Sequence, residues 1–199
     1  EESVINLLSY NIDGIILSEK HHTVRTVKFL RSAKIPIVEL MDVQGAKMDM
    51  EVGFDNRQAA FDMVSTMLAK RQRRKIIYLG SKDDMRDEQR FCGYCDAMNQ
   101  HQLEAYRINP RASSSIYLGS QLMAEAFKTH PDLDGVFCTN DDIAMGALFY
   151  CREHDLAVPE RISIAGFHGL EMGKQMIPSL ASVITPRFDI GRMAAQMLL

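Results

Sequence analysis

The amino-acid sequence predicts a doubly wound α/β fold, and two observations lead to this class. Short apolar runs rich in β-branched residues alternate with stretches of helical period along the whole chain of 199 residues. The runs are apolar on both faces, as the strands of a parallel sheet must be when helices cover both of its sides.

Six of these runs are predicted strands, and the segments between them are predicted helices. The strands are expected at residues 12–17, 35–41, 76–80, 135–138, 162–167 and 181–185. The helices are expected at residues 22–33, 56–71, 84–102, 116–129, 142–154 and from 188 onward. Asp55 and Asp141 stand where a side chain could cap the helix that follows. Residues 1–10 are typical of the tail of an amphipathic helix and the last helix stops without a cap, so we expect a fragment of a longer protein.

Composition argues against several classes of protein. No apolar run approaches the roughly 20 residues of a membrane-spanning helix, and the first residues lack the features of a signal peptide, so no membrane contact or export is predicted. A formal charge of −3 disfavours a nucleic-acid-binding surface on this chain. Four cysteines and thirteen methionines suit free thiols in a reducing cytoplasm, which is the expected location.

Polar side chains follow the predicted strands, at the edge where open parallel sheets bind ligands. Amides, carboxylates, an imidazole and hydroxyls could together hold a polyhydroxylated molecule, because each sugar hydroxyl both donates and accepts hydrogen bonds. Equally, these residues could be the caps and turn residues that loops ordinarily carry. The residues are Ser18, Glu19, Asp42, Asn140, Asp141, His168 and Thr185.

Four spaced motifs give the chain a resemblance to a known family. Residues 11–17 (NIDGIIL), 90–97 (RFCGYCDA), 139–147 (TNDDIAMGA) and 158–167 (VPERISIAGF) resemble, in order and spacing, the effector domain of the lactose-repressor family of transcription regulators. The resemblance covers essentially the whole chain. Within that family it is greatest to the repressors of gluconate and idonate utilisation, through residues 137–142, 166–169 and 182–187.

The resemblance implies a periplasmic-binding-protein-like core of type I, in which two doubly wound parallel-sheet lobes are linked by three crossovers. The first lobe would comprise residues 1–50 and 185–199 and would be incomplete, whereas the second would comprise residues 51–184. The N-terminal DNA-binding head of the family is not part of this sequence, so operator DNA would be contacted only through that missing head. Family members form dimers through faces of both lobes, and a homodimer is therefore expected.

The resemblance also implies ligand-binding roles. Arg90 matches the arginine that holds sugar oxygens, and Asn140 matches the asparagine of an Asn-Asp pair. Ser18 and Thr185 match further polar positions. His168 is a departure, because many members have an aspartate there. Removing that anion avoids a repulsion of about 1 to 4 kcal/mol with an acidic ligand at about 4 Å, which favours a sugar acid over a neutral sugar. The predicted ligand-binding set is Ser18, Glu19, Arg90, Asn140, Asp141, His168 and Thr185, with no cofactor and no metal.

Three other motifs have weaker functional interpretations. Cys92 and Cys95 have the spacing of a redox pair but lie within a predicted helix, and a zinc site would need two further ligands. The basic run at residues 70–75 suits a helix C-terminus better than a nucleic-acid patch. Family members usually have a glycine near Gln72, so we expect a locally altered turn there, costing about 1 kcal/mol. The serines at 113–115 lack the remainder of a phosphate-binding loop.

Residues and resemblance together predict the sugar-acid-binding, dimer-forming core of a transcriptional repressor of carbohydrate utilisation. Ligand binding would shift the two lobes and so alter how the heads meet DNA. No catalytic arrangement is evident, so an enzyme is not predicted. Two alternatives remain, because fold does not determine function. A signal peptide upstream of Glu1 would favour a sugar-binding protein of a transport system, and turnover of gluconate with ATP or NAD would favour a sugar-acid kinase or dehydrogenase.

Overall fold

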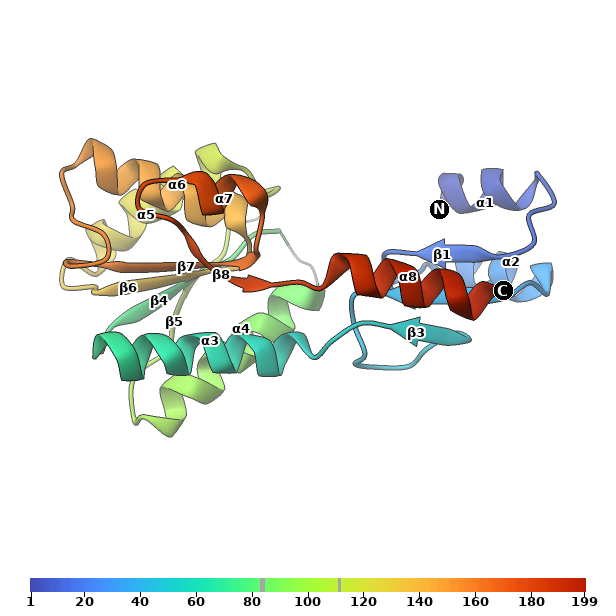
Figure 1. Cartoon of the computed structure of the whole chain (residues 1–199), viewed down its shortest axis with the longest axis horizontal. Coiled ribbons are helices and arrows are strands. Elements are labelled where there is room, and N and C mark those ends of the chain that lie inside the picture. The colour runs from blue at the N-terminus through green and yellow to red at the C-terminus, as the bar shows by residue number, and fades with distance from the viewer. Residues whose placement is uncertain (83–84, 111) are drawn as a thin grey trace. The chain divides into compact units, whose positions relative to one another are not determined.

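A computed structural model describes residues 1–82, 85–110 and 112–199 and divides the chain into two compact units (Figure 1). The first unit contains Glu1–Asp55 and Pro186–Leu199, and the second contains Asn56–Thr185. The first unit extends beyond the expected boundary at residue 50 because residues 50–52 form a strand that pairs with its sheet. None of the helices in the described residues combines the length and the apolarity that a bilayer-spanning segment needs.

The first unit is a small parallel sheet between helices. Its strands are β1 (Ile15–Leu17), β2 (Ile37–Leu40) and β3 (Met50–Val52), in that order across the sheet. Helices α1 (Glu2–Leu8) and α2 (Val24–Ala33) pack through Val4, Leu8 and Leu30 against one face. The last helix, α8 (Arg187–Leu198), packs through Ile190 and Ala194 against Val38 and Val52 on the other face.

The second unit is a five-stranded parallel sheet in the order β5-β4-β6-β7-β8. Helices α3 and α4 cover one face, while α5, α6 and α7 cover the other (Figure 1). All strand pairs in both sheets are parallel, which confirms the predicted α/β class. The strands are β4 (Ile76–Leu79), β5 (Tyr106–Ile108), β6 (Gly135–Cys138), β7 (Ser163–His168) and β8 (Ala181–Ile184). The helices are α3 (Asn56–Arg71), α4 (Met85–Gln100), α5 (Ile116–Thr129), α6 (Asp141–Glu153) and α7 (Glu171–Gln175).

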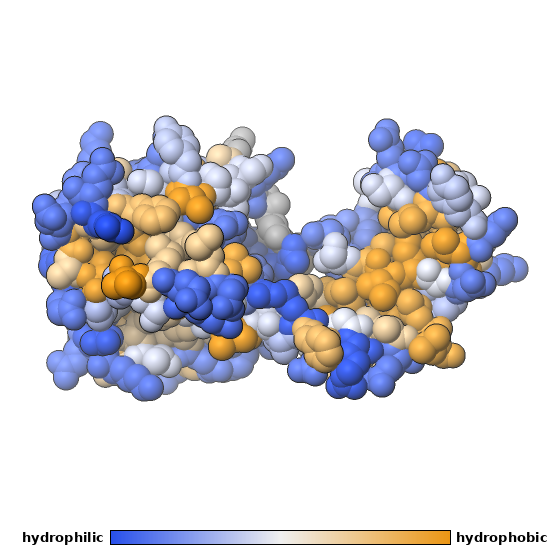
Figure 2. Space-filling model, turned by 45° about the horizontal axis from the view of Figure 1, so that its top comes forward, coloured by the Kyte–Doolittle hydropathy of each residue, from blue (hydrophilic) through white to orange (hydrophobic). Residues whose placement is uncertain are grey.

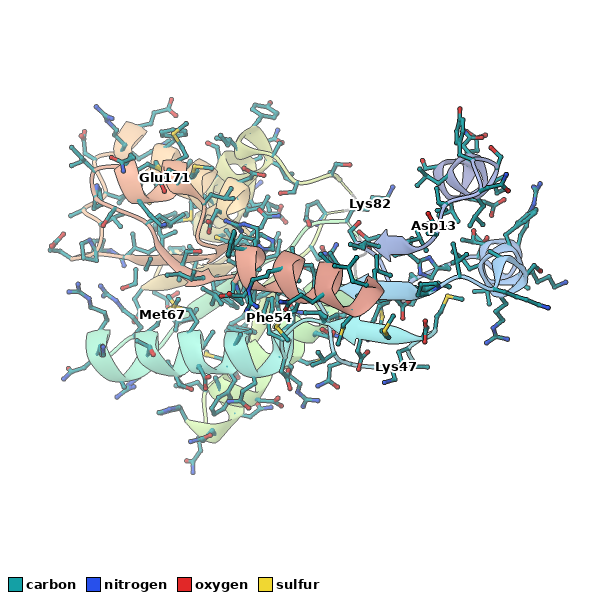
Figure 3. The ribbon with its side chains drawn as sticks, turned by 45° about the vertical axis from the view of Figure 1, so that its right-hand side comes forward. Asp13, Lys47, Phe54, Met67, Lys82 and Glu171 are labelled. Carbon is teal, nitrogen blue, oxygen red and sulfur yellow. The ribbon has the colours of Figure 1, made fainter. Side chains whose placement is uncertain are left out.

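The helices on each face of this second sheet pack closely in pairs. Met67 points from α3 toward the sheet (Figure 3) and is buried. A Cβ atom on Gly93 of α4 would lie 2.0 Å from the Arg57 carbonyl oxygen of α3. A Cβ atom on Gly146 of α6 would likewise lie 2.0 Å from the Ile116 carbonyl oxygen of α5. Both helix pairs therefore approach through a glycine, because any side chain there would force the backbones apart.

The predicted elements are found with few exceptions. Strands β3 and β5 were not predicted because each has only three residues and carries a charged residue at its centre, Glu51 or Arg107. The five-residue helix α7 was also not predicted. The expected start of the α4 helix at Asp84 lies outside the described residues. Cap positions are less well predicted: Asp141 is the first residue of α6, and the cap is Asn140 instead.

The turn after α3 has the left-handed conformation that a glycine would favour. Gln72 follows the last residue of α3 and has a φ of 54°. The expected altered turn is therefore not found: the backbone takes the left-handed conformation, and the glutamine side chain is accommodated in it. A left-handed φ is unfavourable for a residue with a Cβ atom.

We expect Gln72→Gly to raise the free energy of unfolding by up to about 1 kcal/mol, because glycine adopts this conformation without steric cost. For a chain of this size the melting temperature should rise by about 2–4 °C per kcal/mol. Gln58→Gly, within helix α3 itself, is the matched control and should instead lower the free energy of unfolding by about 1 kcal/mol. Equal destabilisation by both substitutions would contradict the assignment of strain to Gln72.

Candidate functional site

The polar residues predicted in the second unit gather at the carboxyl ends of β6, β7 and β8. We call this set, composed of Arg90, Asn140, His168 and Thr185, the polar edge. Its members are linked through neighbouring residues: Arg90 contacts Thr139 and Phe167, which directly precede Asn140 and His168 in the chain. The structure therefore brings four of the seven predicted residues into one cluster.

Arg90 is the buried cation of the polar edge. Its Nε and Nη2 atoms both donate to the Asn56 side-chain oxygen, at 3.1 and 3.0 Å. Its Nη1 atom donates to the Thr139 carbonyl oxygen at 2.7 Å, at the end of β6. The guanidinium carbon lies 3.8 Å from the centre of the Phe167 ring, within the range of a cation–π contact. The orientation of the guanidinium plane is thus set by α3, β6 and β7 together.

Asn140 has a structural role, and its role in ligand binding stays a prediction. Its side-chain oxygen accepts from the Ile143 backbone N–H at 3.0 Å and so caps helix α6. Its amide nitrogen lies 2.7 Å from the Ser114 hydroxyl. Asn140 is therefore held in one orientation, with its side chain half-buried at the end of the strand.

Asp141 differs from its neighbour because it faces the protein interior. Its side chain is fully buried, and its two oxygens accept from the Ser182 hydroxyl and the Leu170 backbone N–H, each at 2.6 Å. A Cβ atom at Gly166 would lie 2.4 Å from this carboxylate, so β7 passes close beside it. The carboxylate of Asp141 therefore positions the β7–α7 loop and strand β8. Its role in ligand binding stays a prediction.

His168 is held in an unusual backbone conformation at the end of β7. Its φ is 110°, a value that residues with a side chain rarely adopt. Its Nδ1 atom lies 3.2 Å from the hydroxyl oxygen of Thr185, which is 4% exposed. Such strain, of order 1–3 kcal/mol, is most often found at functional sites. The imidazole is half-buried and stands edge-on to the Phe167 ring.

Ser18 and Glu19 belong to the first unit, where they directly follow β1, and both are exposed. Their role in ligand binding stays a prediction. Asp42, the polar residue that follows β2, is buried, and its carboxylate accepts from the Gln44 backbone N–H at 2.8 Å. This contact closes a local turn, in agreement with the alternative that strand-end residues serve the loops.

The structure also identifies residues that the sequence did not single out. Asn56, the first residue of α3, and Phe167, within β7, together hold Arg90. Ser114 and Ser182 hold Asn140 and Asp141. No sequence signal marks these residues, because each partner lies 26 or more positions away along the chain.

The structure places the two cysteines and the basic run in or directly after helices. Cys92 and Cys95 lie within α4 as free thiols, and burial raises the pKa of the Cys95 thiol, which disfavours the thiolate needed for redox chemistry. In the basic run, Arg73 donates to the Ser163 hydroxyl at 2.9 Å and Lys75 pairs with Asp132 at 2.6 Å. Across residues 1–82, 85–110 and 112–199, no group of three or more His, Cys, Asp or Glu side chains is arranged to hold a metal ion.

Comparisons with known proteins agree with this architecture. A model of the periplasmic binding protein-like domain matches residues 66–199. The chain is 81% identical to the HTH-type transcriptional regulator IdnR and 46% identical to the HTH-type transcriptional regulator GntR, both of Escherichia coli K12. Both matches cover all of this chain but only 60% of each relative. The crystal structure of a LacI family transcriptional regulator from Silicibacter pomeroyi is 32% identical, with a TM-score of 0.89 over 99% of this chain and 74% of that one.

Asp141→Ala should lower the free energy of unfolding by about 2–3 kcal/mol, because it removes a buried acceptor and leaves two part-buried donors without it. Thermal or urea unfolding measures the change. Asp142→Ala, the neighbouring substitution on the first turn of α6, is the matched control and should cost no more than about 1 kcal/mol. A folded Asp141→Ala variant as stable as the parent would show that the carboxylate is not needed for positioning.

Proposed function

Because the chain belongs to the LacI, or lactose-repressor, family of transcriptional regulators, we propose that it binds a sugar acid of the gluconate or idonate type as an effector. The complete regulator would repress genes of carbohydrate utilisation in the cytoplasm. Its contact with operator DNA would lie outside these residues, whose net charge is −3. The chain spans only 60% of the IdnR and GntR relatives, whose names describe them as HTH-type regulators.

The observation that carries the proposal is the charge of the polar edge. At the end of β7 stands His168, an imidazole beside the Thr185 hydroxyl. The nearby carboxylate, Asp141, is fully buried and used by Ser182 and Leu170. Arg90 contributes a fixed positive charge that suits a carboxylate and its adjacent hydroxyls. An anionic, polyhydroxylated molecule fits this set of donors better than a neutral sugar does.

Regulation requires that the effector bind two arrangements of the protein unequally. A coupling free energy of about 1–3 kcal/mol would change the affinity for DNA by about 5- to 150-fold. The named relatives are transcriptional regulators, which favours this function over a transport protein or a sugar-acid enzyme on the same scaffold. Gluconate turnover with ATP or NAD would still favour the enzyme.

We also propose a homodimer, with the second copy covering an apolar groove of the second unit. The groove has a volume of about 700 Å³ and runs along α6 and α7, where Phe149, Met172 and Ile177 are exposed. Figure 2 shows apolar surface on this unit. Ile177 is 95% exposed, and an apolar patch of this kind is typical of an interface between proteins. A symmetric pair of copies would cover the same patch on both chains.

The homodimer is tested by placing a charge in the groove. Phe149→Asp and Ile177→Asp should each shift the mass measured by light scattering from two chains toward one, because a buried unpaired carboxylate opposes association. Met85→Asp, an exposed apolar residue at the start of α4 that does not line the groove, is the control and should leave the mass unchanged. If the parent protein is a monomer, or if both groove variants remain dimers, a different surface must be used.

The effector is tested by thermal unfolding with D-gluconate, L-idonate, 6-phosphogluconate and glucose. A ligand at 100 times its Kd adds about 2.7 kcal/mol to the free energy of unfolding, so one sugar acid should raise the melting temperature while glucose should not. His168→Asp should weaken binding of that acid by about tenfold or more, because it restores a negative charge beside the ligand. A rise with glucose alone, or no rise with any of these ligands in folded protein, would contradict a sugar-acid effector.

A further inference from the structure

We propose that Asn56 is a positioning residue for effector binding. It holds the guanidinium group of Arg90 in one orientation toward the ligand. Because its side chain is neutral, it does so without adding a negative charge beside Arg90. This inference rests on the proposed sugar-acid function. It assigns a role to a residue that lies at the start of α3, in a segment far from Arg90 in the sequence.

The geometry joins one amide oxygen to two guanidinium donors. Asn56 is fully buried, and its Oδ1 atom accepts from both Nε and Nη2 of Arg90. With Nη1 donating to Thr139 and one face lying over the Phe167 ring, rotation about the last bonds of the arginine side chain is restricted. The donors of Arg90 are thus oriented before the ligand arrives.

Such pre-orientation affects affinity directly. An arginine side chain normally loses considerable rotamer freedom when it is immobilised on a ligand, and a side chain that is already fixed loses less. A guanidinium also recognises a carboxylate through its planar geometry, so the direction of the plane matters as much as the distance. Release of the Asn56 contact should therefore weaken binding even if Arg90 remains in place.

The neutrality of Asn56 is the second part of the inference. Aspartate has nearly the same shape as asparagine, so a carboxylate at this position could accept the same two N–H groups of Arg90. It would hold the guanidinium at least as firmly, because a charge-assisted hydrogen bond is stronger than a neutral one. It would also add a negative charge next to a bound sugar acid. Asn56→Asp therefore separates two effects on ligand binding: the orientation of Arg90, which it keeps, and the local charge, which it changes.

The alternative is that Asn56 only ties α3 to α4. In that case Asn56→Ala would lower the melting temperature, and any loss of affinity would follow from loss of folded protein. Asn56→Asp would then bind the effector as well as the parent does, because the tie between the two helices would be kept. Stability alone cannot distinguish the two roles, whereas the isosteric variant can.

The experiment measures D-gluconate and L-idonate binding by calorimetry in the parent, Asn56→Asp, Asn56→Ala and Asn99→Asp, each checked for folding. Asn99→Asp makes the same change of charge at an exposed position of α4 and is the matched control. We expect Asn56→Asp to melt no lower than the parent and yet to bind the preferred acid about tenfold or more weakly. Added salt should leave this loss largely in place, since buried charges are poorly screened.

A double-mutant cycle identifies Arg90 as the residue through which Asn56 acts. In an Arg90→Gln background, Asn56→Asp should change the Kd by less than about twofold, because the oriented cation is already gone. The inference is overturned if folded Asn56→Asp binds the acid within about twofold of the parent, or if its loss is equal in the Arg90→Gln background. If the parent binds no sugar acid, the proposed function fails, and this inference fails with it.

Discussion

The contacts of buried Arg90 are the constraint on which the polar edge depends. A cation away from water needs acceptors on several sides, since an unsatisfied buried charge is very costly. Arg90 obtains them from the first residue of α3, the backbone carbonyl of Thr139 after β6, and the Phe167 ring of β7. Three elements must therefore end or begin at the same edge of the sheet. These contacts also place Asn140 and His168 at the edge, because Asn140 directly follows Thr139 and His168 directly follows Phe167 in the chain.

Asn140 and Asp141 are adjacent and similar in shape, but they have different structural roles. At the start of α6 the chain changes from extended to helical, so successive side chains point in different directions. Asn140 caps the helix and stays at the edge, whereas Asp141 turns inward to hold Leu170 and Ser182. The buried carboxylate thus fixes the loop that follows His168. Asn140 thus belongs to the polar edge itself, whereas Asp141 holds in place the loop and the strand beside it.

The sequence predicts the architecture well because its signals are local. Apolar runs mark the long central strands, but the short strands β3 and β5 carry charged residues and give no such signal. The end of each strand also indicates where polar residues will gather. The sequence does not indicate the direction of a side chain, so it does not predict that Asn140 lies at the edge while the neighbouring Asp141 is buried. Pairing across the chain, as between Asn56 and Arg90, and the positive φ of His168 depend on tertiary packing and have no local signature.

The proposed selectivity of the polar edge depends on which charges the fold turns inward. The carboxylate of Asp141 is fully buried, and its two oxygens accept from neutral donors of the loop and of β8. The cation of Arg90 is oriented in part by a neutral amide and a backbone carbonyl, neither of which carries a negative charge. His168 occupies a backbone conformation that a glycine would adopt more easily. Strain of this kind is most often found at functional sites, which supports the proposed role of His168 in binding. Support for an acidic ligand therefore comes from Arg90, Asp141 and His168 in combination.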